Sequence, residues 1–315
     1  MKAVLFDRKN PYQKFQIHEV PKPNIRDDEV LVKVHCASPN AADYRSIQMR
    51  IVPKHNILGS AISGIVEEVG KGISQFKVGD EVIADLADVG MGGFAEFKAT
   101  KTSVLVHKPK GVSFEEAAAL PVAATTALQA LRKGGISKGE KVLIIGSAGG
   151  VGTFALQLAK YFETDVTAVC STKSVEQSYN FGADKVIDYM QEDLFNRDDR
   201  YDLILAINGN YPLLKCKQML SKSGQYIAVG GSLKQIFKAL LFGKILSFGK
   251  KKIKAVAAKP FSEDLAFVAD LVEKGKIKPS IEKVYKMEQT DLAMEYLSAG
   301  HAKAKVLISF LPVMR

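Results

Sequence analysis

The stretch of this chain with the clearest chemical meaning is IGSAGGVG, residues 145–152. It follows the apolar run KVLII and precedes the amphipathic pattern TFALQLAKYF. Glycines at such a strand-to-helix joint allow a tight turn and let backbone N–H groups approach an anion, which the positive end of the helix dipole also attracts. A strand, a glycine loop and a helix in this order predict a site for the pyrophosphate of a dinucleotide. The alternative is a glycine-rich turn that binds no ligand.

The residues after the next predicted strand indicate which dinucleotide would bind. Sites selective for NAD carry Asp or Glu about 20 residues beyond the glycine loop, where the carboxylate binds the ribose hydroxyls. In this chain the strand DVTAVC is followed by Ser171, Thr172 and Lys173. A hydroxyl and a cation suit a 2′-phosphate, so this segment favours NADPH as the cofactor. The alternative is an ordinary strand end with Lys173 in solvent.

The elements that must hold these residues alternate regularly. Apolar strand patterns are separated by amphipathic helical patterns, which predicts βαβ units and a parallel sheet. The strands are expected at KVLII, DVTAVC, KVIDY, YDLILAI and QYIAV. Before them, Ser113 and Glu116 have the spacing of a capping box, and a helix is expected to end at Gly134. The first third of the chain reads as short strands, and EVLVKVHCAS alternates, with Val30, Val32, Val34 and Cys36 on one face and His35 on the other.

The chain resembles the medium-chain dehydrogenase/reductases of the zinc-independent, quinone-oxidoreductase type. The matching motifs, in the family's order, are VHCASPNAADYRS, ISGIVEEVG, FKVGDEV, GGFAEF, AAALPVAATTALQAL, IGSAGGVGTFALQLAK, FGADKVIDY and GHAKAKVLI. The resemblance implies an α/β fold with two domains. Residues 1–120 and 260–315 would form a GroES-like, β-rich catalytic domain, and residues 121–259 a Rossmann domain with a doubly wound parallel sheet. It also implies a homodimer.

The resemblance assigns roles to particular residues. The pyrophosphate would lie against Ala148, Gly149, Gly150, Val151 and Gly152, and Thr126 would lie near the nicotinamide. Ser171, Lys173 and Tyr189 would surround the adenosine phosphate, although Tyr189 could equally be a buried aromatic at a strand end. Asn208 and Lys305 are further candidates for cofactor contact. Ser147 departs from the fingerprint of alcohol dehydrogenases, which begins with glycine.

The sequence predicts no metal site. Zinc-dependent relatives need a catalytic Cys/His/Cys-type site and a four-cysteine structural lobe, but Cys36, Cys170 and Cys216 are scattered and lack C-x₂-C spacing. His35 and Cys36 are adjacent, so in a strand they are expected on opposite faces. By resemblance, Asn40 stands where zinc relatives carry the catalytic cysteine, and Gly59-Ser60 where they carry His-Glu.

Without a metal, the nicotinamide would carry the difficult step, the transfer of hydride to a quinone or an α,β-unsaturated carbonyl. Asn40 and Tyr44, in SPNAADYRS, are the candidates to face the substrate oxygen, with Tyr44 as a proton donor. An equally open alternative is that Asn40 and Asp43 organise their loop and take no part in the reaction. Two other functions stay open: a zinc-free alcohol–ketone dehydrogenase, and a non-catalytic NADPH-binding sensor or structural protein.

A lysine-rich insert at residues 232–259 is not explained by the resemblance. Residues 231–260 hold eight lysines and no acidic residue, so they supply +8 of the net charge of +10, and a basic surface for nucleic acid is not expected. Within residues 232–254, apolar residues recur at helical spacing: Leu233, Ile236, Phe237, Leu240 and Leu241. This pattern is typical of a helix that contacts an anionic membrane. The alternative is a helix that packs on the protein with its lysines solvated.

Composition and cysteine content favour a cytoplasmic protein. Of the residues, 47% are hydrophobic and 25% are charged, which is ordinary for a globular chain. Three cysteines, an odd number, fit a reducing compartment better than a disulfide framework. We expect neither a transmembrane helix nor a secretory signal, because no apolar run is long enough.

Overall fold

The computed structural model describes residues 1–7, 15–208, 211–230, 241, 243, 247, 249–300 and 302–310. The chain divides into two compact units. The first consists of Met1–Thr125 and Lys259–Arg315, and the second of Thr126–Ala258. The sequence analysis placed these divisions after residues 120 and 259, a few residues away from the observed ones.

The second unit contains a six-stranded sheet in which all described strands are parallel, in the order β10-β9-β8-β11-β12-β13. The strands are β8 (Lys141–Ile145), β9 (Asp165–Cys170), β10 (Lys185–Asp188), β11 (Tyr201–Ala206), β12 (Leu220–Ala228) and β13 (Lys252–Ala255). The strand order runs outward in both directions from the β8–β11 pair, so the predicted doubly wound parallel sheet is confirmed.

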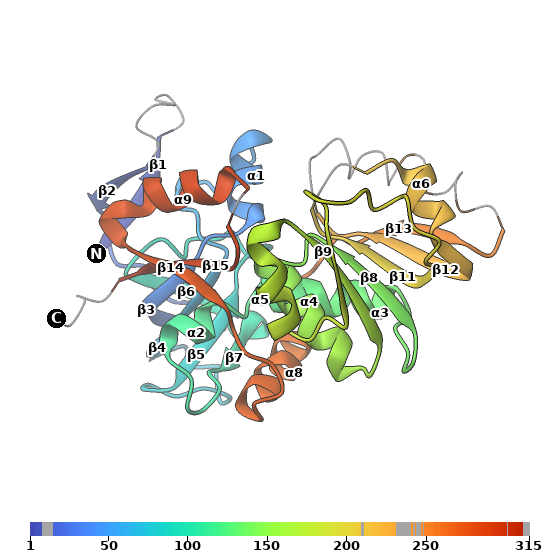
Figure 1. Cartoon of the computed structure of the whole chain (residues 1–315). Coiled ribbons are helices and arrows are strands. Elements are labelled where there is room, and N and C mark those ends of the chain that lie inside the picture. The colour runs from blue at the N-terminus through green and yellow to red at the C-terminus, as the bar shows by residue number, and fades with distance from the viewer. Residues whose placement is uncertain are drawn as a thin grey trace. The chain divides into compact units, whose positions relative to one another are not determined.

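Helices of the second unit connect these strands, as Figure 1 shows. The described ones are α4 (Gly150–Tyr161), the short 3₁₀ helix η2 (Thr172–Ser174), α5 (Val175–Asn180) and α6 (Leu213–Gln218). Helix α3 (Ala123–Lys133) precedes β8 and begins at the end of the first unit. Helix α4 packs against β8 and β9, and its buried side chains include Phe154 and Leu158 on the face that the apolar spacing predicted. The apolar strands β8 and β9 are buried along nearly their whole length because helices cover the sheet.

Most strand pairs of the first unit are antiparallel, so it is called the antiparallel unit below, but β14 and β15 pair in parallel. Its main sheet has the order β14-β15-β3-β4-β5-β7, with β6 also paired to β3, and β1 and β2 form a separate pair. These strands are β1 (Lys2–Phe6), β2 (Phe15–Glu19), β3 (Glu29–Ser38), β4 (Ala61–Val69), β5 (Glu81–Asp85), β6 (Phe97–Lys101), β7 (Leu105–His107), β14 (Ile281–Lys286) and β15 (Lys305–Ser309). The helices are α1 (Ala41–Gln48), η1 (Thr102–Val104), α2 (Phe114–Ala118), α8 (Ser262–Glu273), η3 (Met287–Gln289) and α9 (Thr290–Ser298).

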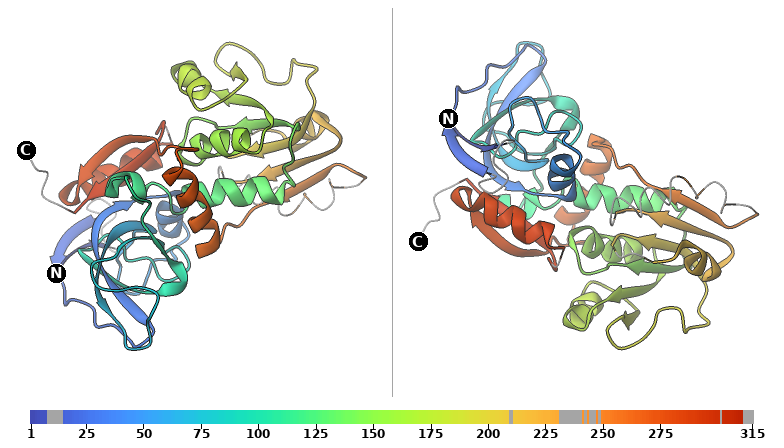
Figure 2. Two further views of the ribbon diagram at one scale, coloured as in Figure 1. Left: turned by 90° about the horizontal axis from the view of Figure 1, so that it is seen from below. Right: turned by 90° about the horizontal axis from the view of Figure 1, so that it is seen from above.

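The C-terminal segment completes the sheet of the N-terminal segment. Ile308 of β15 pairs with Ala37 of β3, so segments from opposite ends of the sequence lie side by side. Both views in Figure 2 show the red C-terminal strands next to the blue N-terminal ones. This pairing brings Lys305, the first residue of β15, to the end of β3 that leads into α1.

The alternation predicted for β3 fails at its end. Val30, Val32 and Val34 share one hydrophobic cluster as expected, but Ala37 continues it, whereas Cys36 packs with Ala118 and Leu307 in another cluster. The pairing register with β4 shifts between Val34 and Cys36, which is a β-bulge. A bulge adds one residue to one strand and so reverses which face the following side chains take.

The bulge also overturns the expected separation of His35 and Cys36. The His35 ring lies 4.2 Å from the Phe114 ring, centroid to centroid, and Phe114 packs against the cluster that contains Cys36. Both side chains therefore contact the same region of α2. The expectation that His35 and Cys36 lie on opposite faces, which was one reason to exclude a shared metal, is therefore wrong.

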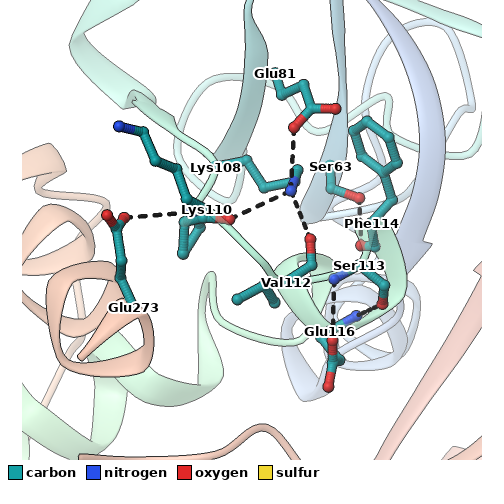
Figure 3. Close-up of polar contacts among 10 residues, drawn as sticks. Ser63, Glu81, Lys108, Lys110, Val112, Ser113, Phe114, Glu116 and Glu273 are labelled. Carbon is teal, nitrogen blue, oxygen red and sulfur yellow. Dashed lines mark hydrogen bonds and ion pairs between the residues drawn. The ribbon is translucent and has the colours of Figure 1, made fainter. Parts of the chain in front are cut away.

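The segment that leads from β7 into α2 is fixed by polar contacts, shown in Figure 3. The Lys108 ammonium donates to the carbonyl of Val112 and lies 3.1 Å from a Glu81 carboxylate oxygen. The predicted capping box is present, because the Glu116 N–H donates to the Ser113 hydroxyl and the Ser113 N–H donates to the Glu116 carboxylate. Helix α2 ends before Pro121, and α3 then continues to Lys133, one residue before Gly134.

Half of the lysine-rich insert, including residues 232–240, where most of the predicted helical pattern falls, lies outside the described residues. Within the described part of it, β13 pairs with β12 as the edge strand of the parallel sheet. Among the helices that the structure describes, none is long and apolar enough to cross a membrane.

Candidate functional site

The glycine loop of the second unit lies at the carboxyl ends of β8, β9 and β11. Gly146 has a φ of 84°, in the left-handed region, and its N–H donates to the Val169 carbonyl over 3.0 Å. A Cβ at Gly146 would lie 2.9 Å from the backbone nitrogen of Asn208, which follows β11. The loop therefore crosses the sheet where its strand order reverses, the place where open α/β sheets bind ligands.

Gly152 lets the first turn of α4 come close to the loop. A Cβ at this position would meet the carbonyl oxygen of Gly146 and lie 2.5 Å from that of Ser147, so any side chain would strike backbone. The N-cap of α4 is Gly149, and no side chain caps the helix there. The N–H groups of the first turn are left to bind an anion, so these residues fit a pyrophosphate.

Ser147 anchors the loop, a role that the sequence reasoning missed. Its hydroxyl is fully buried and lies 3.1 Å from the Ser178 hydroxyl of α5 and 3.4 Å from the Val169 carbonyl. The Ser178 hydroxyl in turn donates to the sulfur of Cys170 over 3.5 Å. The sequence did carry a signal for this role. Ser147 stands where the usual fingerprint has glycine, and a buried serine hydroxyl needs a hydrogen-bond partner.

The residues predicted around the adenosine phosphate are neighbours in the structure. Ser171 and Lys173 follow β9, and Tyr189 follows β10, which is the next strand in the sheet. The Tyr189 N–H donates to the Cys170 carbonyl over 3.1 Å, which holds the two strand ends together. Lys173 is exposed and Tyr189 is 49% exposed, so the alternative of a buried aromatic at Tyr189 is wrong.

The other residues of the second unit that were predicted to contact the cofactor differ in location and burial. Ala148 and Val151 belong to the loop and the first turn of α4 and are half-buried. Asn208 is exposed beside Gly146. Thr126 is buried in α3, with 9% of its surface exposed. Lys305 belongs to the first unit.

The first unit contains a buried polar network around Asn40. The Lys305 ammonium donates to Asn40 Oδ1 over 2.6 Å, although 265 residues separate them in sequence. Asn40 Nδ2 donates to the Ser38 carbonyl over 2.8 Å and to the Ser60 hydroxyl over 3.2 Å. The Ser60 hydroxyl donates to Asp43 over 2.7 Å.

Asp43 ties this network to the start of α1. Its carboxylate accepts the backbone N–H of Asn40 over 2.7 Å and that of Gly59 over 2.9 Å, and it is fully buried. Asn40 is the N-cap of α1. Both amide donors of Asn40 are therefore used inside the protein, which favours the alternative that Asn40 and Asp43 organise their loop. Tyr44, on the same helix, is half-buried and packs against the core of the unit.

Burial shifts the titration of three groups in this region. It raises the pKa of Asp85, at the end of β5, to about 6, opposed by hydrogen bonds from the backbone of Ala87 and Val122. It raises the pKa of Asp43 too, opposed by the hydrogen bonds from Ser60, Asn40 and Gly59. It lowers the pKa of Lys305 to about 8, although Asp43, Asp85 and Cys36 act in the opposite direction. A buried ammonium thus stands among buried carboxyl groups.

The residues at the positions of a catalytic zinc site do not fit zinc. Zinc in proteins is bound by thiolate, imidazole or carboxylate groups. The positions that the resemblance aligns with zinc ligands carry the amide of Asn40, the glycine Gly59 and the hydroxyl of Ser60, and the Lys305 ammonium repels a second cation there. Among the described residues, no group of three or more His, Cys, Asp or Glu could hold a metal ion.

Two protein families match this chain. The alcohol dehydrogenase GroES-like domain matches residues 26–110, and the zinc-binding dehydrogenase family matches residues 181–308. The first match lies in the antiparallel unit, so the expected GroES-like domain is confirmed.

Relatives over nearly the full length point in the same direction. The chloroplast envelope quinone oxidoreductase homolog of Arabidopsis thaliana is 32% identical, over 92% of each chain. The NADPH-dependent alkenal/one oxidoreductase of the same plant is 30% identical, over 92% of this chain and 74% of that protein. Among solved structures, the quinone oxidoreductase from Coxiella burnetii matches with a TM-score of 0.89 and 26% identity, over 99% of each chain.

Proposed function

The chain belongs to the quinone-oxidoreductase group of the medium-chain dehydrogenase/reductase family, and we propose that it is a zinc-independent reductase that uses NADPH to reduce a quinone or an α,β-unsaturated carbonyl. Its class as an NAD(P)-dependent oxidoreductase follows from the family. The acceptor is proposed from two of the relatives, a quinone oxidoreductase homolog and an alkenal/one oxidoreductase.

The single observation that carries the cofactor proposal is the loop between β8 and α4. Gly149, Gly150, Val151 and Gly152 would hold the pyrophosphate, because glycine at position 152 brings the helix N-terminus and the loop backbone together. Ser171 and Lys173 would bind the 2′-phosphate, and none of the three residues directly after β9 carries a carboxylate that would favour NADH. Bound NADPH supplies the hydride.

In this proposal the antiparallel unit binds the acceptor and donates a proton to it. Reduction of a quinone or an enone puts negative charge on the acceptor oxygen, which a positioned donor can neutralise. Tyr44 is the donor that we propose, because the amide of Asn40 already makes two hydrogen bonds within the protein. Tyr44→Phe should lower kcat and leave the Kd for NADPH unchanged. Unchanged turnover would remove Tyr44 from the mechanism.

The proposal of a metal-free mechanism rests on the donor set around Asn40. An amide, a hydroxyl and an ammonium are poor ligands for zinc. Protein treated with a chelator and then dialysed should keep its full turnover with NADPH and a quinone, and added zinc should not raise it. A gain of activity on adding zinc would contradict the proposal.

Two further functions are outcomes of the same assay. Turnover of a saturated ketone in preference to a quinone or an enone would indicate an alcohol–ketone dehydrogenase. NADPH binding without turnover of any acceptor would indicate a sensor or structural protein. We also propose a homodimer, which rests on the resemblance, and light scattering on the purified protein tests it.

A further inference from the structure

The buried network around Asn40 contains one fixed cation, the Lys305 ammonium. Only 4% of the Lys305 surface is exposed. The backbone of this residue is held at the start of β15, where its N–H donates to the Ser280 carbonyl over 2.9 Å and it pairs with Ile281 of β14. The stem of the side chain is therefore anchored, and its ammonium is delivered to Asn40 over 2.6 Å.

Asn40 transmits this contact to the part of the unit that carries Tyr44. As the N-cap of α1, Asn40 sets where that helix begins, and its amide also bonds to Ser38 at the end of β3 and to Ser60 before β4. Four elements, β15, β3, β4 and α1, thus meet at one side chain. Substitution or deprotonation of Lys305 should therefore displace the N-terminus of α1, which is one turn from Tyr44.

The charges around Lys305 explain why an ammonium is needed there. Asp43 on α1 and Asp85 on β5 are the buried carboxyl groups that interact with it, and the Cys36 thiol on β3 is the third titratable neighbour. Asp43 is fully buried and Asp85 is 5% exposed. A buried carboxylate without a compensating cation is strongly unfavourable, so loss of the ammonium charge favours rearrangement or protonation of this cluster.

We infer that Lys305 is a positioning residue, whose ammonium holds Asn40 and through it the start of α1 and Tyr44 in the active arrangement, and that loss of its proton lowers turnover in alkaline solution. This role within the first unit is separate from the contact with the cofactor that the resemblance implies for Lys305, which stays a prediction. The inference rests on the proposed reductase function for its kinetic consequence, but its structural half can be measured without turnover.

The direction of the pH effect follows from the titration of the group. Burial lowers the pKa of Lys305 to about 8 from its ordinary value near 10.5, so the ammonium is intact at neutral pH and is lost as the pH rises through about 8. If only the protonated form is active, kcat falls about tenfold between pH 7 and pH 9. NADPH affinity should change little over that range, because the hydrogen bonds of Lys305 join it to Asn40 and Ser280 of its own unit.

The kinetic test compares pH profiles of kcat for the wild type and three variants. Lys305→Arg keeps its charge at alkaline pH, so its kcat should stay level where that of the wild type falls. Lys305→Met should lower kcat at every pH and abolish the alkaline limb, with an unchanged Kd for NADPH. Lys283→Met, on the neighbouring strand β14, is the matched control and should behave as the wild type. A wild-type profile that stays level to about pH 9.5 would overturn the inference.

Lys305→Met leaves two buried carboxyl groups without their cation and can fail to fold. The charge-balanced variant Lys305→Met/Asp43→Asn removes one charge of each sign and serves in that case. It should fold, keep the Kd for NADPH and lack the alkaline limb. Retention of the wild-type alkaline limb in this variant would refute the role of Lys305.

A second measurement separates the inference from the proposed function. It is an NMR titration of NADPH-bound protein labelled with ¹⁵N-asparagine. The side-chain amide signal of Asn40 is assigned by its loss in Asn40→Asp. Its chemical shift should change with pH, with a midpoint near pH 8. The shift should be absent in Lys305→Arg. A wild-type protein that shows this titration but reduces no acceptor would disprove the proposed function and keep the structural role of Lys305. A signal that does not titrate would disprove that role.

Discussion

An alanine at position 152 should weaken NADPH binding without unfolding the protein. The added Cβ would meet the carbonyl oxygen of Gly146 and lie 2.5 Å from the carbonyl carbon and oxygen of Ser147. These are backbone atoms of the phosphate-binding loop, so they cannot turn aside as the end of a side chain can. The loop has to move away from the first turn of α4, and the N–H groups that would cradle the pyrophosphate then diverge.

The expected size of this effect follows from the cost of overpacking. Forcing one extra methyl group into a filled site costs about 1–3 kcal/mol. If binding NADPH requires the original loop geometry, this cost reappears in the binding free energy. The Kd for NADPH should then rise about 5- to 150-fold, because about 1.4 kcal/mol corresponds to a factor of ten.

The assay is fluorescence titration of NADPH, with thermal unfolding measured on the same samples. Gly64→Ala is the matched control, because a Cβ there would meet the Lys33 carbonyl and lie 2.9 Å from Val32 Cγ1 in the antiparallel unit. It should lower the Tm as much as Gly152→Ala does, yet leave the Kd for NADPH unchanged. An unchanged Kd in Gly152→Ala, or an equal loss of affinity in both variants, would refute the assignment of this loop.

Three further predictions concern selectivity, pH and the insert. Lys173→Glu should raise the KM for NADPH about 10- to 150-fold, which corresponds to the loss of a hydrogen bond to a charged group, and should not raise the KM for NADH. The control Lys185→Glu, at the end of β10 away from Tyr189, should change neither KM. Equal changes with both cofactors would contradict a 2′-phosphate site. Burial raises the pKa of Asp85 to about 6 in the folded protein, so its stabilising contribution is complete below the unfolded pKa near 3.8 and is lost as the pH rises through about 6. Asp85→Asn should therefore raise the free energy of unfolding by up to about 3 kcal/mol at pH 8 and by little at pH 4. An equal gain at both pH values would contradict the raised pKa of Asp85. Liposomes with anionic lipid should carry the protein upward in a flotation gradient and neutral liposomes should not, if residues 232–254 contact membranes; absence of binding to both would end that hypothesis.

The sequence predicted best where the determinants are local. Five of the six described parallel strands were predicted, because they are mostly apolar runs between helical patterns. The sixth, β13, lies in the lysine-rich insert and was missed, since its sequence KIKA alternates lysine with apolar residues. The capping box at Ser113 was found for the same reason, since its two hydrogen bonds join residues only three apart. The glycine loop combined two local signals, its composition and its place between a strand and a helix.

The sequence predicted poorly where distant segments decide the outcome. Nothing near Asn40 indicates that a lysine 265 residues later donates to its side chain, so the contact between Asn40 and Lys305 was not predicted. The bulge in β3 depends on its pairing with β4, and it moved Cys36 to the other face against the alternation. A buried Asp at the end of the apolar strand EVIAD was a signal for the polar network, because a carboxyl group in such a place needs partners.

The proposed reaction is the transfer of hydride from NADPH to a conjugated acceptor without a metal. The most direct test follows NADPH consumption by metal-stripped protein with a quinone, a 2-alkenal and a saturated ketone, and repeats each with NADH. We predict turnover of the quinone or the 2-alkenal, a preference for NADPH over NADH, and little reaction with the saturated ketone. Activity that appears only after zinc is added, or NADPH binding with no turnover of any of the three acceptors, would contradict the account.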